Sequence, residues 1–170
     1  MQKTITTLLL SLTLIIGWFA SLAAAPNQQP LSDVEALQGV SEGKVVFDIG
    51  MANPQTLPLY LKVIAQTHAD LLRQKVTPNI ILAFRGGAVK LVSNNREALP
   101  MEHHPKLEEI AALLADLQQK PGVRMEVCAL ATNLMGVDNG TILPGIKVVG
   151  NTFVSLTGYH AQGYAAIPIH

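Results

Sequence analysis

Cys128, the only cysteine in the chain, is the residue with the most reactive side chain in this sequence. It lies in the stretch GVRMEVCALATNLMG, at the end of an apolar run that is typical of a buried strand. A thiol becomes a nucleophile or a sulfur acceptor only as the thiolate, which a nearby cation or backbone amides favour. A cysteine also serves as a small apolar side chain in a core. The residues alone leave both interpretations open.

Arg85 is the cation that we expect near this thiol. It belongs to the run NIILAFRGG, in which Gly86 and Gly87 leave backbone N–H groups free to point at an anion. Asn53 follows another apolar run, KVVFDIG. Functional groups gather beyond the carboxyl ends of parallel strands, so we expect Asn53, Arg85 and Cys128 at one edge of a sheet. The alternatives are a salt bridge for Arg85 and an ordinary tight turn for the glycine pair.

The pattern does not place any of the five histidines as a catalytic base. His68 falls on the apolar stripe of a predicted helix, where a hydrogen-bonded core or interface histidine is expected. His103 and His104 suit a helix N-terminus better than a metal site, because zinc needs three or four ligands at workable spacings. His160 is expected on the solvated face of the last helix. With no Walker loop and no dinucleotide fingerprint in the sequence, we predict no cofactor and no metal.

Residues 1–25 are predicted to be a secretory signal peptide. Lys3 is their only charge, an apolar run follows it, and Ala23 and Ala25 form an Ala-x-Ala pattern. We expect cleavage after Ala25 and a periplasmic or secreted protein. The alternative is an uncleaved membrane anchor, since the apolar run approaches the roughly 18–20 residues that span a bilayer. Residues 26–43 are polar and rich in proline and glycine, which predicts a lead-in segment with at most one short helix around 32–37.

Removal of this peptide leaves 170 minus 25, or 145 residues, the size of one compact domain. Only Lys3 is lost from the charged residues, so 11 basic and 12 acidic residues give a formal charge of −1. The sequence contains no run of like charges, so it gives no indication of a nucleic-acid partner. A single cysteine cannot form an internal disulfide. Charged residues make up 14% of the chain against a typical ~25%, so we expect some helix faces to be buried between subunits.

Strand-like and helix-like segments alternate along the chain. The first helix should begin at an N-cap Thr56 with Pro58 in its first turn, and its apolar face includes Leu57, Ile64 and either Tyr60 or Leu61. The predicted strands are KVVFDIG (44–50), NIILAFRGG (79–87), VRMEVCAL (123–130), IKVVG (146–150) and YAAIPI (164–169), and the predicted helices lie in 53–74, 104–122 and 151–163.

This alternation implies parallel strands joined by right-handed crossovers. We therefore predict one α/β domain over residues 44–170, an open parallel five-stranded sheet with helices on both faces. Pro168 marks the last strand as an edge strand or a strand end, because proline cannot donate a hydrogen bond to a neighbouring strand.

From Lys44 to Ile169 the chain resembles the DsrE/DsrF-like family, also described as YchN-like. The matching pieces are FRGGAVKLV, GVRMEVCALATNLMGV and LPGIKVVGNTFVSLTGYHAQGYAAIPI. The resemblance implies a three-layer α/β fold, assembly as homo-trimers or homo-hexamers and, in some members, a cysteine that carries sulfur as a persulfide. That cysteine corresponds to Cys128. Arg85 stands where family members often have a histidine, so a shared acid–base role is not carried over.

Two functional hypotheses follow. In the first, Cys128 takes sulfane sulfur from a donor protein or a small sulfur anion, and Arg85 with the amides of Gly86, Gly87 and Ala129 stabilises the thiolate or the donor. In the second, the protein is an oligomeric periplasmic accessory protein that binds a small anion at the strand ends, and Cys128 only packs. A cysteine hydrolase would need a base beside the thiol, and the sequence places none.

Overall fold

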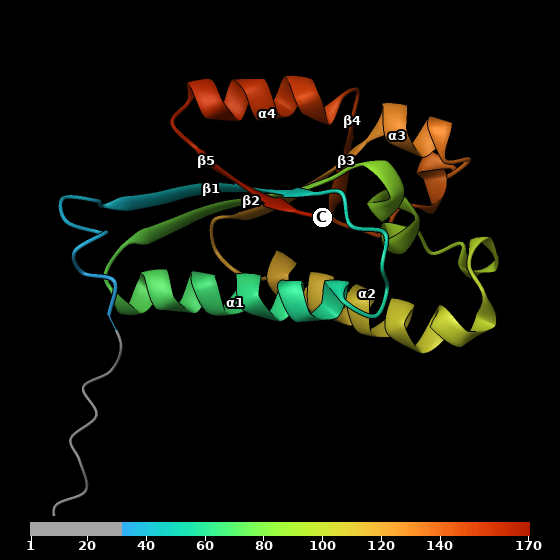
Figure 1. Ribbon diagram of the computed structural model, residues 1–170, viewed down its shortest axis with the longest axis horizontal. Helices are drawn as coiled ribbons and strands as arrows, with labels where there is room; N and C mark the ends of the chain where they lie inside the picture. The colour runs from blue at the N-terminus through green and yellow to red at the C-terminus, as the bar shows by residue number, and fades with distance from the viewer. Residues whose placement is uncertain (1–31) are drawn as a thin grey trace, which may run out of the picture. The chain divides into compact units, whose positions relative to one another are not determined.

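The computed structural model describes residues 32–170 (Figure 1). The predicted signal peptide, its cleavage site and the start of the lead-in segment lie outside this range. Residues 32–41 contain turns and a bend but no helix, which is compatible with the prediction of at most one short helix around 32–37. Within residues 32–170, no helix is long and apolar enough to cross a membrane.

Five parallel strands form one sheet in the order β4-β3-β2-β1-β5, which confirms the predicted sheet. β5 is an edge strand, in agreement with Pro168 near its end. The lead-in segment is shorter than predicted, because β1 starts at Glu42 and pairs with β2 from that residue on. The strands are β1 (Glu42–Ile49), β2 (Thr77–Phe84), β3 (Val123–Cys128), β4 (Ile146–Val149) and β5 (Ala165–Ile169).

Helices connect the strands. The α-helices are α1 (Leu57–Arg73), α2 (His104–Gln118), α3 (Ala129–Leu134) and α4 (Thr152–Ala161), and the short 3-10 helices are η1 (Gly86–Val92), η2 (Arg96–Ala98), η3 (Met101–His103) and η4 (Asn139–Thr141). The predicted helices correspond to α1, α2 and α4. At the start of α4, the Asn151 side chain accepts a hydrogen bond from the Phe153 amide, as expected of a capping asparagine.

The apolar stripe of α1 is buried as its spacing predicts. Leu57, Leu61 and Ile64 are buried, whereas Tyr60 is exposed, which decides between the two alternatives at that turn. Thr56 occupies the N-cap position without a side-chain capping bond. His68 is buried, and its Nε2 lies 2.9 Å from the Pro121 carbonyl oxygen, as expected of a hydrogen-bonded core histidine.

The third strand is shorter than predicted, and this is a correction. Its last two predicted residues, Ala129 and Leu130, begin α3 instead. A short apolar run does not distinguish a buried strand from a buried helix, and VRMEVCAL runs across the boundary between them. The chain turns at Cys128, which is both the last residue of β3 and the N-cap of α3.

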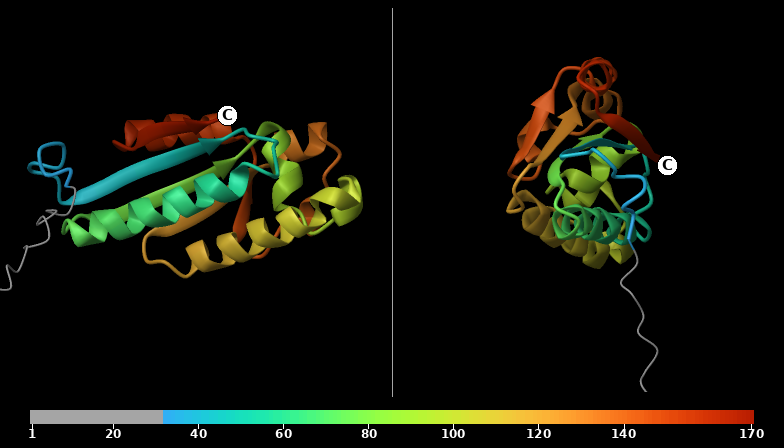
Figure 2. Two further views of the ribbon diagram at one scale, coloured as in Figure 1. Left: turned by 60° about the horizontal axis from the view of Figure 1, so that its bottom comes forward. Right: turned by 90° about the vertical axis from the view of Figure 1, so that its left-hand side faces the viewer.

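The elements form three layers. α1 and α2 cover one face of the sheet and α4 lies over the other, as Figure 1 and the right-hand view of Figure 2 show. The larger core cluster lies under α1 and α2 and includes Leu61 and Ile110, each with no exposed area. A smaller cluster of Val46, Ile81, Ala83 and Tyr164 lies on the α4 face.

Candidate functional site

The carboxyl ends of the strands carry the residues with chemical potential. Cys128 ends β3, and Arg85 follows β2. Asn53 follows β1 by four residues, and His170 follows β5 directly. All strands are parallel, so these ends meet at one edge of the sheet. Two cavities open at this edge, and Arg85 lines both of them.

Cys128 has only 4% of its surface exposed. Burial raises the pKa of its thiol, because the thiolate loses solvation. Hydrogen bonds from the Thr152 backbone, the Ala131 backbone, the Thr152 hydroxyl and the Leu130 backbone act in the opposite direction and outweigh burial. The pKa of Cys128 therefore lies below its ordinary value of 9.0, which increases the thiolate fraction at neutral pH.

The cavity above Cys128, here called the thiol cavity, has a volume of about 180 Å³. Most of its wall is apolar, and Leu130, Leu134 and Phe153 on its rim are exposed. A small molecule or a partner side chain would meet an apolar surface before it meets the sulfur. The lining residues are Arg85, Gly86, Cys128, Leu130, Ala131, Leu134, Met135, Asn151, Thr152 and Phe153.

Arg85 forms a bidentate ion pair with Asp48 of β1. Its Nε lies 2.5 Å and its Nη2 2.8 Å from the two carboxylate oxygens. This hydrogen-bonded pairing with Asp48 raises the pKa of Arg85 above its ordinary value, and the charge of the Cys128 thiolate contributes in the same direction. The guanidinium carbon also lies 5.4 Å from the centre of the Phe153 ring. Because Asp48 balances the charge of Arg85, the guanidinium acts on the thiolate as one half of a neutral pair.

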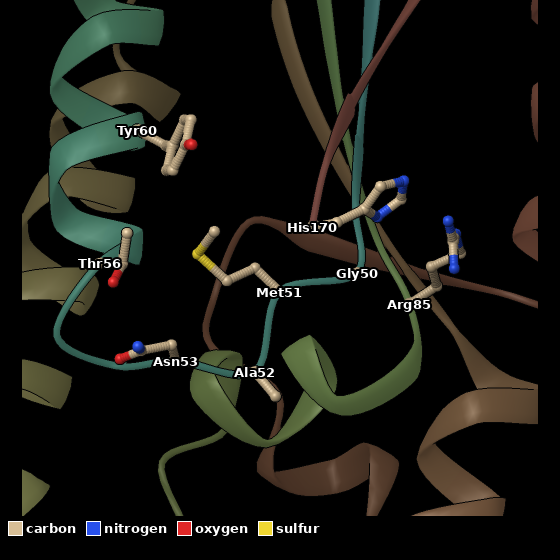
Figure 3. Close-up of a pocket in the computed structure, with 8 residues that line it drawn as sticks. All are labelled: Gly50, Met51, Ala52, Asn53, Thr56, Tyr60, Arg85 and His170. Carbon is tan, nitrogen blue, oxygen red and sulfur yellow. The ribbon is translucent and has the colours of Figure 1, made fainter.

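The second cavity, here called the Arg85–His170 cleft, has a volume of about 660 Å³. Figure 3 shows the His170 imidazole beside the Arg85 guanidinium, with Met51 pointing into the space between them and α1. Both side chains lie close to Gly50: a Cβ there would lie 3.3 Å from Arg85 Nη1 and 3.4 Å from His170 Nδ1. The cleft is lined by Gly50, Met51, Ala52, Asn53, Thr56, Tyr60, Arg85 and His170.

The structure separates the predicted ligand-binding residues. Gly86 lines the thiol cavity, whereas Asn53 lines the Arg85–His170 cleft and accepts a hydrogen bond from the Gln55 amide through Oδ1. A Cβ on Gly87 would lie 2.6 Å from the Ala52 Cβ, so Gly87 packs against the loop after β1. Ala129 is the first residue of α3, next to the thiol.

Sequence reasoning missed three contributors. Thr152 follows β4, and His170 follows β5, so the strand-end rule applied to all five strands identifies both. Asp48 belongs to the predicted strand KVVFDIG, but its pairing with Arg85 was not predicted. That pairing depends on the β1–β2 register, in which Asp48 lies opposite Ala83, two residues before Arg85.

Residues 32–170 hold no group of three or more His, Cys, Asp or Glu side chains placed to bind a metal ion. Cys128 and Arg85 support two kinds of chemistry, nucleophilic attack by the Cys128 sulfur and binding of an anion next to Arg85. The fold and this edge define a class: a parallel α/β protein with a cysteine thiol at a strand end.

The chain belongs to the DsrE/DsrF-like family, whose model matches residues 44–169. A solved structure of a protein of unknown function, MTH1491 from Methanobacterium thermoautotrophicum, is similar with a TM-score of 0.60 at 20% identity, over 75% of this chain and 100% of that one. The YchN protein from E. coli is similar with a TM-score of 0.49 at 15% identity, over 75% of this chain and 99% of that one. No curated protein matches the chain.

Proposed function

We propose that this protein carries sulfane sulfur on Cys128. The observation that carries the proposal is the placement of the thiol, which ends β3, caps the N-terminus of α3 and lines the thiol cavity. The groups around it, Thr152, Ala131 and Leu130, lower its pKa in spite of burial. Membership of the DsrE/DsrF-like family supports it.

The proposed reaction is a transfer between two sulfur atoms. The Cys128 thiolate attacks the outer sulfur of a persulfide R–S–SH, the bond between the donor's two sulfurs breaks, and R–S⁻ leaves with the electron pair. Cys128 then holds the transferred sulfur as Cys–S–SH, and attack by an acceptor thiolate on that outer sulfur regenerates the thiolate. Electrons balance within each exchange, so no separate oxidant or reductant takes part.

Intact-mass spectrometry of the folded protein tests the proposal. Incubation with polysulfide should add one sulfur atom, about 32 Da, and Cys128→Ser should show no gain. A thiol that gains no mass and that reacts with a labelling reagent only after unfolding would be a packed residue, and the proposal would be wrong.

Thr152→Val provides a matched control for the cause of the activation. Valine keeps the shape of threonine and removes the hydroxyl hydrogen bond, while the backbone amide of residue 152 stays in place. The pH midpoint of thiol labelling should therefore rise in this variant and stay below that of a free thiol. An unchanged midpoint would assign the lowered pKa to the backbone amides alone.

A second candidate function is favoured by the Arg85–His170 cleft. Arg85 Nη1 makes no hydrogen bond to the described residues, because its ion pair with Asp48 uses Nε and Nη2. A small anion in the cleft would find this donor beside His170. Thiosulfate binding in a calorimeter that survives Cys128→Ser and disappears in Arg85→Ala would support a binding or accessory role.

The proposal includes export and self-association. Residues 1–25 would direct export, and a mature chain that starts at Pro26 would be the expected product. Exposed apolar residues lie on α4 (Phe153 and Val154) and on the edge strands β4 (Val148) and β5 (Ile167), and they support burial of apolar surface between subunits of a homo-trimer or homo-hexamer. Light scattering that finds a monomer at micromolar concentration would contradict the assembly.

A further inference from the structure

Glu126 is a buried carboxylate on β3, between β2 and β4, that the proposed sulfur chemistry does not use. It lies on β3, and only 5% of its surface is exposed. Its Oε2 accepts a hydrogen bond of 2.9 Å from the Tyr159 hydroxyl, donated from α4. Its Oε1 is buried and accepts no hydrogen bond from the described residues. A buried charge with half of its acceptor capacity unused is costly, which calls for an explanation.

Glu126 lines a cavity of about 390 Å³, here called the Glu126 cleft. This volume is within the range of small-molecule sites. Arg124 and Lys147 line the same cleft, and Ile81 contributes an apolar wall. The Glu126 cleft shares no lining residue with the thiol cavity.

The two cations are placed on the same face as Glu126. Arg124 precedes it by two residues on β3, and Lys147 lies directly opposite it on β4. Arg124 uses Nη2 to contact Asn79 and the Tyr164 hydroxyl, which leaves its Nε and Nη1 without a hydrogen bond to the described residues. Lys147 is exposed and has no carboxylate within ion-pair distance among residues 32–170.

The cleft therefore presents two positive charges and one negative charge. A simple anion would leave the Glu126 carboxylate unsatisfied, and a simple cation would meet two like charges. A molecule with both an ammonium and a carboxylate group satisfies both ends. The terminal torsion of a glutamate is soft, so a small rotation presents Oε1 to a donor in the cleft and leaves Oε2 within reach of the Tyr159 hydroxyl.

The wall of the cleft adds a neutral polar group. Gly145 has a φ of +83°, and a Cβ there would clash with the side chain of Gln118. The glycine thus lets the Gln118 amide lie against the cleft, where it offers both a donor and an acceptor.

We propose that the Glu126 cleft binds a small zwitterion of the α-amino acid class, with the ammonium group on Glu126 and the carboxylate on Lys147 and Arg124. The apolar surface of Ile81 favours an uncharged side chain on the ligand. This site does not depend on the proposed function of Cys128.

Calorimetric titration of the full chain with L-leucine, L-methionine and L-glutamine, each alone, tests the site. At least one should bind with a Kd below about 1 mM. For the amino acid that binds, the N-acetyl form loses the ammonium group and the amide form loses the carboxylate. Each should bind at least about tenfold more weakly, because a hydrogen bond between charged groups is lost.

Variants locate the site on the protein. Glu126→Gln keeps the shape and removes the charge, and Lys147→Met removes the cation at an exposed position, where substitutions usually change stability little. Each should weaken binding at least about tenfold, whereas Cys128→Ser should leave it unchanged. The proposal is overturned if none of the three amino acids binds, if the blocked forms bind as well as the free one, or if Lys147→Met binds like the unmodified protein.

Discussion

The two faces of the sheet differ in how much apolar surface covers them. Under α1 and α2, 24 buried residues of the described chain form one cluster, whereas the cluster on the α4 face has four. Asp48 and Glu126 alternate along their strands with residues of the larger cluster, so both carboxylates face α4. Burial on the first face holds the fold together, and the second face has room for charged groups.

The face under α1 and α2 therefore contributes most of the stability, and the α4 face carries the charged groups that could bind a ligand. A densely packed face leaves little space for a ligand away from the strand ends, and it cannot hold a charge without a partner. The α4 face has Glu126 with one hydrogen bond, exposed apolar residues and the pairing of Asp48 with Arg85. Substitutions on the two faces should therefore have effects of different kind and size.

The largest expected effect comes from the same substitution made once on each face. Leu61→Ala on α1 removes a side chain with no exposed area and should lower the free energy of unfolding by about 2–5 kcal/mol. Leu156→Ala on α4 removes a partly buried side chain that packs on the smaller cluster, and should cost about 1 kcal/mol. Urea unfolding of both variants measures the contrast. Equal losses would show that the α4 face supports the fold as much as the other face does.

Much of this contrast could be predicted from the sequence. Apolar residues recur every three or four positions in α1, and this period is set by the helix itself, so Leu57 and Ile64 were correctly expected on one buried face. The strands were recognisable as short apolar runs, and their alternation with helices predicted a parallel sheet. The boundary at Cys128 was missed, because the apolar run continues into α3.

The sequence predicted which residues of the candidate site lie at the strand ends, but not which side chains contact one another there. Cys128, Arg85 and Asn53 were correctly expected at one edge, because that placement follows from topology alone. Two contacts were not predicted: the pairing of Arg85 with Asp48, and the hydrogen bond from Tyr159 to Glu126. Each joins residues more than 30 positions apart in the sequence. A single glutamate inside an apolar strand was the available signal for the Glu126 cleft.

An intermediate effect is expected at the hydrogen bond between α4 and the sheet. Tyr159→Phe removes the one hydrogen bond that Glu126 accepts from the described residues, and should lower the free energy of unfolding by about 1–3 kcal/mol. Urea unfolding measures this loss, with Tyr60→Phe at an exposed position of α1 as the control. If both variants unfold alike, the carboxylate has another partner and the α4 face is better satisfied than its contacts indicate.

The titration of the Tyr159 hydroxyl gives a second test of its hydrogen bond to Glu126. Burial, and then the hydrogen bond to Glu126, raise the pKa of Tyr159 to about 12 from its ordinary value of 10.0. The folded state therefore favours the protonated phenol, so its stabilisation is complete below pH 10 and is lost as the pH rises to about 12. Ultraviolet titration of tyrosinate should show one late tyrosine that is absent in Tyr159→Phe. Its persistence in that variant would assign the shift to another residue.

The smallest effect is expected from a surface contact of the densely packed face. Glu109 on α2 accepts hydrogen bonds of 2.8 Å from Lys106 and 2.7 Å from Lys62 of α1, which lower its pKa to about 2 from its ordinary value of 4.5. This stabilisation is present above pH 4.5 and is lost as the pH falls to about 2. Because the pair is exposed and salt screens it, Glu109→Gln should lower stability at pH 7 only slightly, and less at high salt. A loss as large as that of Leu61→Ala would mean that charge pairing, and not apolar burial, holds α1 against α2.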